Sequence, residues 1–307
     1  MFLRTVNSRQ LIHTGITTSV GLTTEQSIEV GAWKWFYREA KPETETDKTP
    51  VVFLHGIPSQ SYSWCEIMPK LAERGMRAIA PDWIGHGFSD KPEKQDFAYT
   101  PEAYREALGQ FLDALELERV SLVVQGFLAS VGIQYALRNR DRVQRLVILN
   151  TPLSPNVKLP WKMKQWSIPL VGDMVVQDPL IVDRTLEGGS GFLISDENLD
   201  VYRKPFLQAS VVGRALKTTT QRLDLPKVTA ELEKELPTWT KPLQIIWGCA
   251  DPWLDVSPVE ILAQSRNNIE LVKLPEAKHY PQEHWSEEIS KVLVDFLRRQ
   301  DPTGETG

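Results

Sequence analysis

Short, almost wholly apolar runs alternate with stretches of helical periodicity along most of the chain, and this alternation constrains the fold more than any other feature. Strands with apolar side chains on both faces are typical of a parallel sheet that is covered by helices on each side. The sequence therefore predicts an α/β fold with a mostly parallel sheet. The expected strands are 27–37 (a pair around Gly31), 51–56, 77–83, 121–126, 145–150, 242–248 and 269–274, and the expected helices are 63–74, 101–117, 127–140, 257–266 and 284–299.

The alternation stops between residues 152 and 238, where prolines are frequent, EGGSG at 187–191 predicts flexibility, and 197–217 has helical character. Such an interruption indicates an insertion, which would place a ligand crevice at the carboxyl ends of the strands. The predicted organisation is a mobile tail at 1–24, a core made of 25–151 and 239–300, a helical cap at 152–238 and a C-terminal tail at 301–307.

Composition excludes several function classes. The 35 basic against 40 acidic side chains give a net charge of −5, which argues against nucleic acid as a partner. Two cysteines, Cys65 and Cys249, form no disulfide framework, so we expect the cytoplasm; an organelle interior is the alternative, because the N-terminus lacks acidic residues before Glu25 and could serve as a transit peptide. No run is long enough for a transmembrane segment, and no motif indicates a metal or a cofactor.

Four short segments lie where predicted strands end. They are His55-Gly56-Ile57-Pro58, the run DWIGHGFSD at 82–90, Asp251 in WGCAD, and His279 in KHYPQEHW. Their order and spacing resemble the α/β-hydrolase superfamily, above all the haloalkane dehalogenases and epoxide hydrolases, over roughly residues 27–299. The resemblance implies an α/β-hydrolase fold with helices on both faces of the sheet and an inserted helical cap.

The resemblance also implies a nucleophile on a sharp strand-to-helix turn, the nucleophile elbow. The corresponding segment is LVVQGFLASVG, which puts Gly126 at the nucleophile position. Glycine has no side chain that could attack a substrate. The family usually has a glycine two residues later, where this chain has Leu128, and we expect Leu128 to crowd the helix against the strand.

The other catalytic positions that the resemblance implies are occupied. His279 corresponds to the base, Asp251 to the acid that orients it, and the backbone N–H groups of Ile57 and Phe127 to an oxyanion hole. In dehalogenases, side chains at the positions of Ile57 and Phe127 also hold the halide, but neither of these two can donate a hydrogen bond. We therefore expect no dehalogenation, because both the nucleophile and the halide-binding side chains are missing.

Three functions remain open. The first is a protein without a nucleophile that binds a small apolar ligand or a protein partner in or near the pocket under the cap. The second is an enzyme that uses the His279–Asp251 pair as a base without a covalent intermediate, like the cofactor-free dioxygenases of the superfamily. The third is an active hydrolase of esters, epoxides or halides, in which another side chain replaces the nucleophile; Ser130 is a weak candidate for that role.

The remaining conspicuous residues have structural interpretations. His55, Asp82 and Asp90 are expected to hold their loops, and Cys249 to be inert. Glu283 and His284 are expected to start the last helix on a solvated face. Residues 157–176 contain two tryptophans, two methionines and three lysines, and are expected to line the pocket; peripheral membrane or partner contact is the alternative.

Overall fold

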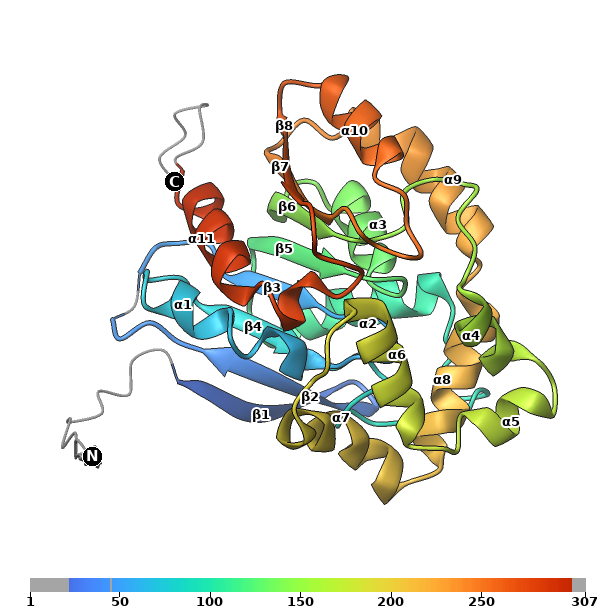
Figure 1. The fold of residues 1–307 in the computed structure, drawn as a ribbon. Coiled ribbons are helices and arrows are strands. Elements are labelled where there is room, and N and C mark those ends of the chain that lie inside the picture. The colour runs from blue at the N-terminus through green and yellow to red at the C-terminus, as the bar shows by residue number, and fades with distance from the viewer. Residues whose placement is uncertain (1–21, 45, 300–307) are drawn as a thin grey trace, which may run out of the picture.

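The computed structural model describes residues 22–44 and 46–299, which form one eight-stranded sheet with helices on both faces (Figure 1). The strand order is β1-β2-β4-β3-β5-β6-β7-β8. Strand β2 is antiparallel to both of its neighbours, β1 and β4, and all other neighbouring strands are parallel. The predicted mostly parallel sheet is confirmed. The strands are β1 Thr23–Val30, β2 Trp33–Ala40, β3 Val51–Leu54, β4 Ala78–Pro81, β5 Val120–Gln125, β6 Val143–Leu149, β7 Leu243–Gly248 and β8 Ile269–Leu274.

The central strands are buried on both faces because their side chains enter two separate apolar clusters. In β3, Val52 and Leu54 join one cluster and Val51 and Phe53 the other, as the strand period of two requires. Helices α2 (Pro101–Ala114), α3 (Ser130–Arg138) and α10 (Ser257–Gln264) pack into the first cluster, and α1 (Met68–Ala72) and α11 (Ser286–Leu297) into the second. This explains the nearly continuous apolar runs of the sequence.

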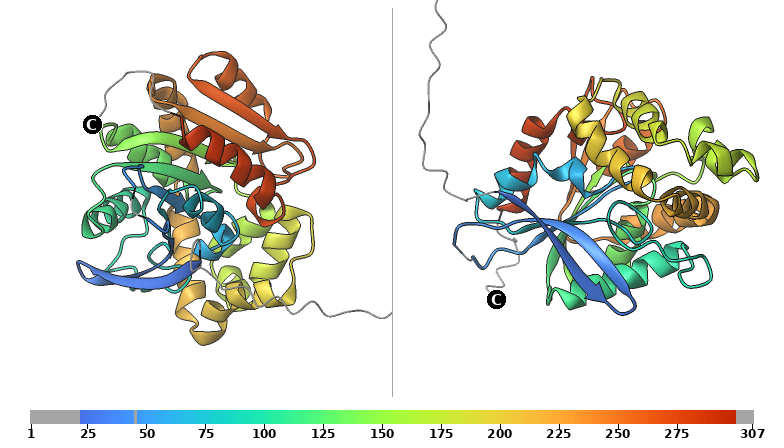
Figure 2. Two further views of the ribbon diagram at one scale, coloured as in Figure 1. Left: turned by 90° about the vertical axis from the view of Figure 1, so that its left-hand side faces the viewer. Right: turned by 90° about the horizontal axis from the view of Figure 1, so that it is seen from below.

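The insertion between β6 and β7 consists mainly of helices: α4 Trp161–Lys164, α5 Val171–Val175, α6 Leu180–Ser190, α7 Asp196–Gln208, α8 Val211–Arg222 and α9 Leu225–Glu235, with 3-10 turns η2 Gln165–Ser167 and η3 Leu236–Thr238. It contacts the loop after β3, where Gln60 donates to the carbonyl of Val201 at 2.7 Å. Two views of the ribbon show these helices on one side of the molecule (Figure 2). Within the described ranges, none of the helices combines the length and apolar content that a bilayer-crossing span requires.

Several element boundaries differ from the predictions. The helix expected at 63–74 is split into η1 (Ser61–Trp64) and α1, which has Pro69 in its first turn. The helix expected at 127–140 starts only at Ser130, because 126–129 form the turn after β5. The last helix starts at Ser286, after a 3-10 turn, η4 (Pro281–Glu283).

Two predictions of flexibility also need correction. Residues 187–190 of the EGGSG run form the last turn of α6, which ends at Gly191 in a left-handed conformation. Strand β1 begins at Thr23, inside the range assigned to the N-terminal tail. The rest of that predicted tail up to residue 21, and the predicted C-terminal tail at 301–307, lie outside the described residues.

Candidate functional site

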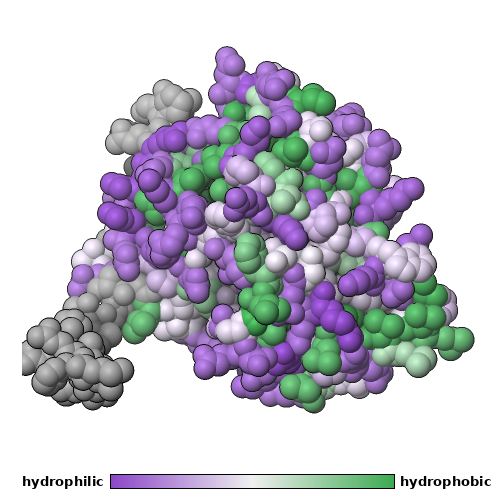
Figure 3. All heavy atoms as spheres, in the orientation of Figure 1, coloured by the Kyte–Doolittle hydropathy of each residue, from purple (hydrophilic) through white to green (hydrophobic). Residues whose placement is uncertain are grey.

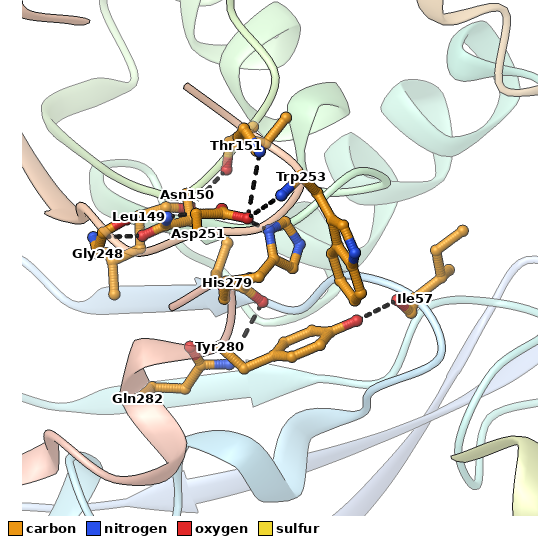
Figure 4. Close-up of polar contacts among 12 residues, drawn as sticks. Ile57, Leu149, Asn150, Thr151, Gly248, Asp251, Trp253, His279, Tyr280 and Gln282 are labelled. Atoms are coloured by element: carbon orange, nitrogen blue, oxygen red, sulfur yellow. Dashed lines mark hydrogen bonds and ion pairs between the residues drawn. The ribbon is translucent and has the colours of Figure 1, made fainter. Parts of the chain in front are cut away.

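The residues singled out by the family resemblance come together at the carboxyl ends of β3, β5, β7 and β8. Ile57 follows β3, Gly126 and Phe127 follow β5, Asp251 follows β7 and His279 follows β8. Because the carboxyl ends of parallel strands share one edge of the sheet, four loops that are distant in sequence meet there. Figure 4 shows Asp251, His279, Trp253, Tyr280 and Ile57 in this cluster.

Gly126 forms the sharp turn between β5 and α3 with a φ of +86°, a conformation that only glycine adopts without strain. A Cβ atom built there would lie 3.8 Å from Nε2 of His279 and 3.0 Å from Cα of Gly56. A side chain at position 126 would therefore point toward the imidazole. The two glycine backbones approach each other so closely that a Cβ on Gly56 would lie 2.9 Å from Cα of Gly126.

The imidazole of His279 is held by Asp251. Its Nδ1 lies 2.8 Å from Oδ2 of Asp251, and both side chains are fully buried. Because a carboxylate only accepts hydrogen bonds, Nδ1 donates, which leaves Nε2 as the second functional nitrogen. This arrangement suits a general base or acid whose reacting nitrogen is turned toward position 126.

Asp251 is itself fixed by three further donors. Its Oδ1 accepts from the backbone N–H groups of Trp253 at 2.8 Å and Leu254 at 3.2 Å, and Oδ2 accepts from Nδ2 of Asn150 at 2.8 Å. Asn150 directly follows β6 and also holds the backbone of Gly248. Its Nδ2 donates to the carbonyl of Gly248, and its Oδ1 accepts from the N–H of Gly248. Asn150 ties β6 to the acid, and no motif in the sequence predicts this role.

The main chain of His279 is also anchored. Its N–H donates to the carbonyl of Gly189 in α6 at 2.9 Å, and its carbonyl accepts from the side chain of Gln125 at 2.7 Å. Gln125 is the last residue of β5, so the strand that precedes the elbow also positions the base. Gly189 lies in the insertion, which therefore contributes directly to the placement of His279.

Aromatic rings enclose the imidazole. The ring centroids of Trp253, Tyr280 and Phe127 lie 4.6, 4.8 and 5.2 Å from that of His279. Nε2 of His279 is buried and has no hydrogen-bond partner. The base is thus packed among aromatic rings, with its reacting nitrogen unpaired.

A cavity of about 570 Å³ lies beside this cluster, between the loops that follow β6 and β7. Trp253 lines it and also packs against His279, which is not among the lining residues. Apolar groups of Leu153, Val157, Trp247, Leu254 and Val259 form much of the wall, with Lys158 and Asp255 adding charge. Among residues 22–44 and 46–299, no group of three or more His, Cys, Asp or Glu side chains is placed to hold a metal ion.

The two backbone positions expected to form an oxyanion hole flank the elbow. Within the described part of the chain, neither the N–H of Ile57 nor that of Phe127 donates a hydrogen bond. The carbonyl of Ile57 accepts from the hydroxyl of Tyr280 at 2.9 Å, which links this loop to the residue after the base. Both side chains are buried and carry no hydrogen-bond donor.

His55, Asp82 and Asp90, which are predicted to hold their loops, each form hydrogen bonds with backbone groups. His55 contacts the carbonyl of Gly56 at 2.7 Å, and burial lowers the pKa of its imidazole. Asp82 accepts from the backbone N–H groups of Ser61 and Phe88, both at 2.7 Å, and Asp90 from that of Lys34 at 2.8 Å. These contacts hold loops at the edge of the site.

Ser130 and Cys249 show no features of nucleophiles. The hydroxyl of Ser130 is buried in the first turn of α3 and donates to the carbonyl of Phe127 at 2.7 Å. Burial raises the pKa of the Cys249 thiol, which disfavours the reactive thiolate.

The prediction that Glu283 lies on a solvated helix face is wrong. It belongs to the 3-10 turn η4 and accepts a hydrogen bond from the hydroxyl of Tyr202 in α7 at 2.7 Å. Burial, with a smaller contribution from the carboxylate of Glu66, raises its pKa from 4.5 to about 7. His284, next to it, is exposed, as expected.

Comparison with known proteins shows the family of the chain. Residues 49–284 match the family defined as the alpha/beta hydrolase fold, and the chain belongs to that family. Within it, the chain is similar to haloalkane dehalogenases. Haloalkane dehalogenase 2 of Mycobacterium tuberculosis strain H37Rv is 28% identical over 251 residues, which cover 80% of this chain and 87% of the relative. A haloalkane dehalogenase of Mesorhizobium japonicum is 29% identical over 267 residues, covering 80% and 84%.

Solved structures support the same fold. A putative ancestral haloalkane dehalogenase matches with a TM-score of 0.77 at 27% identity, covering 89% of this chain and 98% of its own. The haloalkane dehalogenase DbeA of Bradyrhizobium elkani matches with a TM-score of 0.78 at 23% identity, covering 90% and 97%.

Proposed function

We propose that this chain is a haloalkane dehalogenase-like α/β-hydrolase protein that has no covalent nucleophile and acts by binding a small apolar ligand at the carboxyl ends of its strands. The observation that carries the proposal is the position of Gly126. It occupies the turn between β5 and α3, and its missing side chain would point to Nε2 of His279 at 3.8 Å. A covalent mechanism needs an attacking atom at this place, and glycine supplies none.

The surroundings of the elbow support the same conclusion. Dehalogenation requires groups that stabilise the departing halide, and the side chains of Ile57 and Phe127 have no donor to offer. Ser130, the alternative nucleophile, donates its hydroxyl to the carbonyl of Phe127 inside α3. The cavity of about 570 Å³ next to Trp253 offers space for a ligand, with apolar side chains such as Leu153 and Val259 in its wall. We further propose that 152–238 acts as the cap, since Gly189 within it binds the backbone of His279.

Base catalysis without a nucleophile is the second candidate, and one observation favours it. The imidazole of His279 is oriented by Asp251, and its Nε2 has no partner. Such a nitrogen could accept a proton from an acidic substrate or from water once a ligand reaches it. This reaction would leave no enzyme-bound intermediate.

A substrate panel distinguishes these candidates from an ordinary hydrolase. Wild-type protein is incubated with chromogenic esters, epoxides and haloalkanes, and the intact mass is recorded to detect a covalent adduct. We expect neither turnover nor adduct, and the same result for His279→Ala. Turnover with an adduct would reject the loss of covalent catalysis, whereas adduct-free turnover that His279→Ala abolishes would support the second candidate.

Ligand binding is tested separately by thermal unfolding in the presence of small apolar compounds. A ligand that binds only the folded state raises the unfolding temperature. We expect such a rise for wild-type protein and its loss in Val259→Trp, which fills the cavity wall. A compound set that stabilises neither protein would reject binding at this cavity.

A further inference from the structure

The segment 157–176, which we call the α4–α5 protrusion, exposes an unusual number of large apolar side chains. Trp161 is 64% exposed, Leu170 80%, Val171 45% and Met174 78%. Helix α5 lies at the outer rim of the molecule in Figure 1, and the right-hand view of Figure 2 shows the same helices projecting outward. The surface view shows a group of hydrophobic residues at this edge (Figure 3).

The tip of the protrusion is a strained turn. Leu170 has a φ of +64° and a ψ of −51°, and the N–H of Val171 donates to the carbonyl of Pro169 at 2.8 Å. These values define a γ-turn of the rare, strained form with a positive φ. A leucine held in this conformation with its side chain in water carries two unfavourable features at once. Strain of this kind is characteristic of functional segments.

The base of the protrusion is firmly packed, so the exposed tip is not a loose loop. Met163 and Trp166 are buried in the main apolar cluster, and Val176 lies there too. Gly172 packs so closely that a Cβ would lie 2.1 Å from the carbonyl oxygen of Trp166. The protrusion is therefore a rigid platform that presents its apolar side chains outward.

The protrusion carries three lysines in and just before α4. Lys158, Lys162 and Lys164 are exposed, and within the described part of the chain none of them forms an ion pair. The one acid of the segment, Asp173, is paired with Lys217 at 2.6 Å. The whole chain carries a net charge of −5, so this segment is basic on a molecule that is acidic overall.

We propose that the α4–α5 protrusion docks on the surface of a lipid bilayer that contains anionic lipids. Trp161, Leu170, Val171 and Met174 would enter the boundary between headgroups and acyl chains, and the three lysines would contact the anionic headgroups. A rigid apolar tip with tryptophan and a basic surround has the composition of an interfacial membrane anchor. A second copy of the chain is a poorer occupant, because a two-fold contact through this segment would bring the same three lysines of both molecules together.

This proposal does not rest on the proposed function, because the protrusion contains none of the residues around Gly126 and His279. Val157 and Lys158 at its start also line the cavity of about 570 Å³, but Lys162, Leu170 and Met174, the positions changed below, do not. Failure of the membrane-docking proposal in the following experiment would say nothing about the function of the elbow. In the same way, the result of the substrate panel would say nothing about membrane docking. The two proposals are therefore tested separately.

The experiment measures co-sedimentation of the full chain with vesicles of phosphatidylcholine, with and without phosphatidylserine. We expect binding to the mixed vesicles that weakens as salt is raised. Leu170→Gln with Met174→Gln should reduce the affinity about tenfold, because two exposed apolar anchors are lost. Lys162→Gln alone should reduce it roughly fivefold, the contribution of one basic residue near an anionic surface.

The matched control is Ile261→Gln on α10, an apolar residue that is 69% exposed away from the protrusion and should leave binding unchanged. Each variant is first checked by its unfolding temperature. Equal binding of wild type and the double variant would overturn the proposal, as would equal affinity for vesicles without phosphatidylserine. Sedimentation velocity provides a further test. If wild-type protein is a dimer and the double variant is a monomer, the surface serves self-association and the proposal is wrong.

Discussion

At the elbow, two glycine backbones approach within van der Waals contact of each other beside the base. The nearest obstacle to a side chain at position 126 is Cα of Gly56, at 3.0 Å from a built Cβ. Leu128, predicted to crowd the helix against the strand, is fully buried in the main apolar cluster and is not among the three atoms nearest to that Cβ. The restriction at the elbow therefore comes from the backbone.

This geometry predicts the effect of restoring a hydroxyl. Gly126→Ser should place its oxygen within hydrogen-bond reach of Nε2 of His279, because Cβ already lies 3.8 Å from that atom. We expect slow hydrolysis of a small chromogenic ester that His279→Ala abolishes. The positive φ should lower the free energy of unfolding by about 1–3 kcal/mol.

Gly126→Ala is the matched control for this variant. It has the same Cβ and the same backbone strain but no hydroxyl, so it should be destabilised equally and remain inactive. Adding Leu128→Gly should lower stability by a further ~2–5 kcal/mol, because it removes a buried side chain from the core. An active Gly126→Ala, or an inactive but folded Gly126→Ser, would contradict this account of the elbow.

Glu283 predicts a pH dependence of stability. Its pKa in the folded protein is raised from 4.5 to about 7. Between these values the folded state holds a proton that the unfolded state has lost, so stability falls as the pH rises through this window. Glu283→Gln keeps an uncharged acceptor for Tyr202 and should flatten this decline, with a gain of roughly 3 kcal/mol above the window.

The measurement is the free energy of unfolding in urea at several pH values. Glu288→Gln, an exposed acid on the neighbouring α11, serves as the control and should leave the pH profile of wild type unchanged. If the Glu283→Gln profile follows that of the control, the carboxyl group titrates normally in the folded protein.

At the scale of elements, α6 provides a matched pair of adjacent glycines. A Cβ on Gly189 would lie 2.5 Å from the ring of Tyr280 and 2.6 Å from that of Trp253, whereas a Cβ on Gly188 would meet nothing within 4 Å. Gly189→Ala should therefore displace the aromatic wall around His279 and destabilise the protein by ~1–3 kcal/mol. Gly188→Ala should be neutral or gain up to about 1 kcal/mol, because alanine favours the helix. Thermal and urea unfolding of both variants measure the difference.

The same helix shows why some elements could not be predicted from the sequence. The two glycines of EGGSG favour a loop by intrinsic propensity, but packing of Gly189 against Tyr280 and Trp253 requires the absence of a side chain inside a helix. The partners lie far along the chain, so no local pattern reveals them. Strands such as β5 and β6 were predictable, because burial on both faces leaves a continuous apolar run.

At the scale of the whole molecule, the candidate site was predictable only in part. The order of short motifs at strand ends located the positions of His279, Asp251 and Gly126, because the fold brings strand ends together. The supporting residues Asn150, Gln125 and Glu283 were not recognised. Asn150 lies 101 residues from its partner Asp251, and Gln125 lies 154 from His279, so nothing in their local sequence announces the contact.

Contacts between the insertion and the sheet predict how the molecule unfolds. Glu231 of α9 is bound by Gln134 at 2.7 Å and by Arg138 at 2.6 Å, both on α3. The backbone of His279 is bound by Gly189 of α6. We expect one cooperative transition, with equal calorimetric and van't Hoff enthalpies. Two separated transitions in calorimetry would show that 152–238 is an independent folding unit.

The left-handed conformation at position 126 also has an evolutionary consequence. Mutation to glycine at such a position relieves backbone strain and is favoured by selection for stability, whereas mutation away from glycine restores the strain. Substitutions to glycine at this position should therefore be retained more often than substitutions from glycine to another residue. A lineage with glycine at the elbow regains an attacking side chain only where selection for turnover outweighs the loss of stability, so the family should contain more independent arrivals at glycine than departures from it.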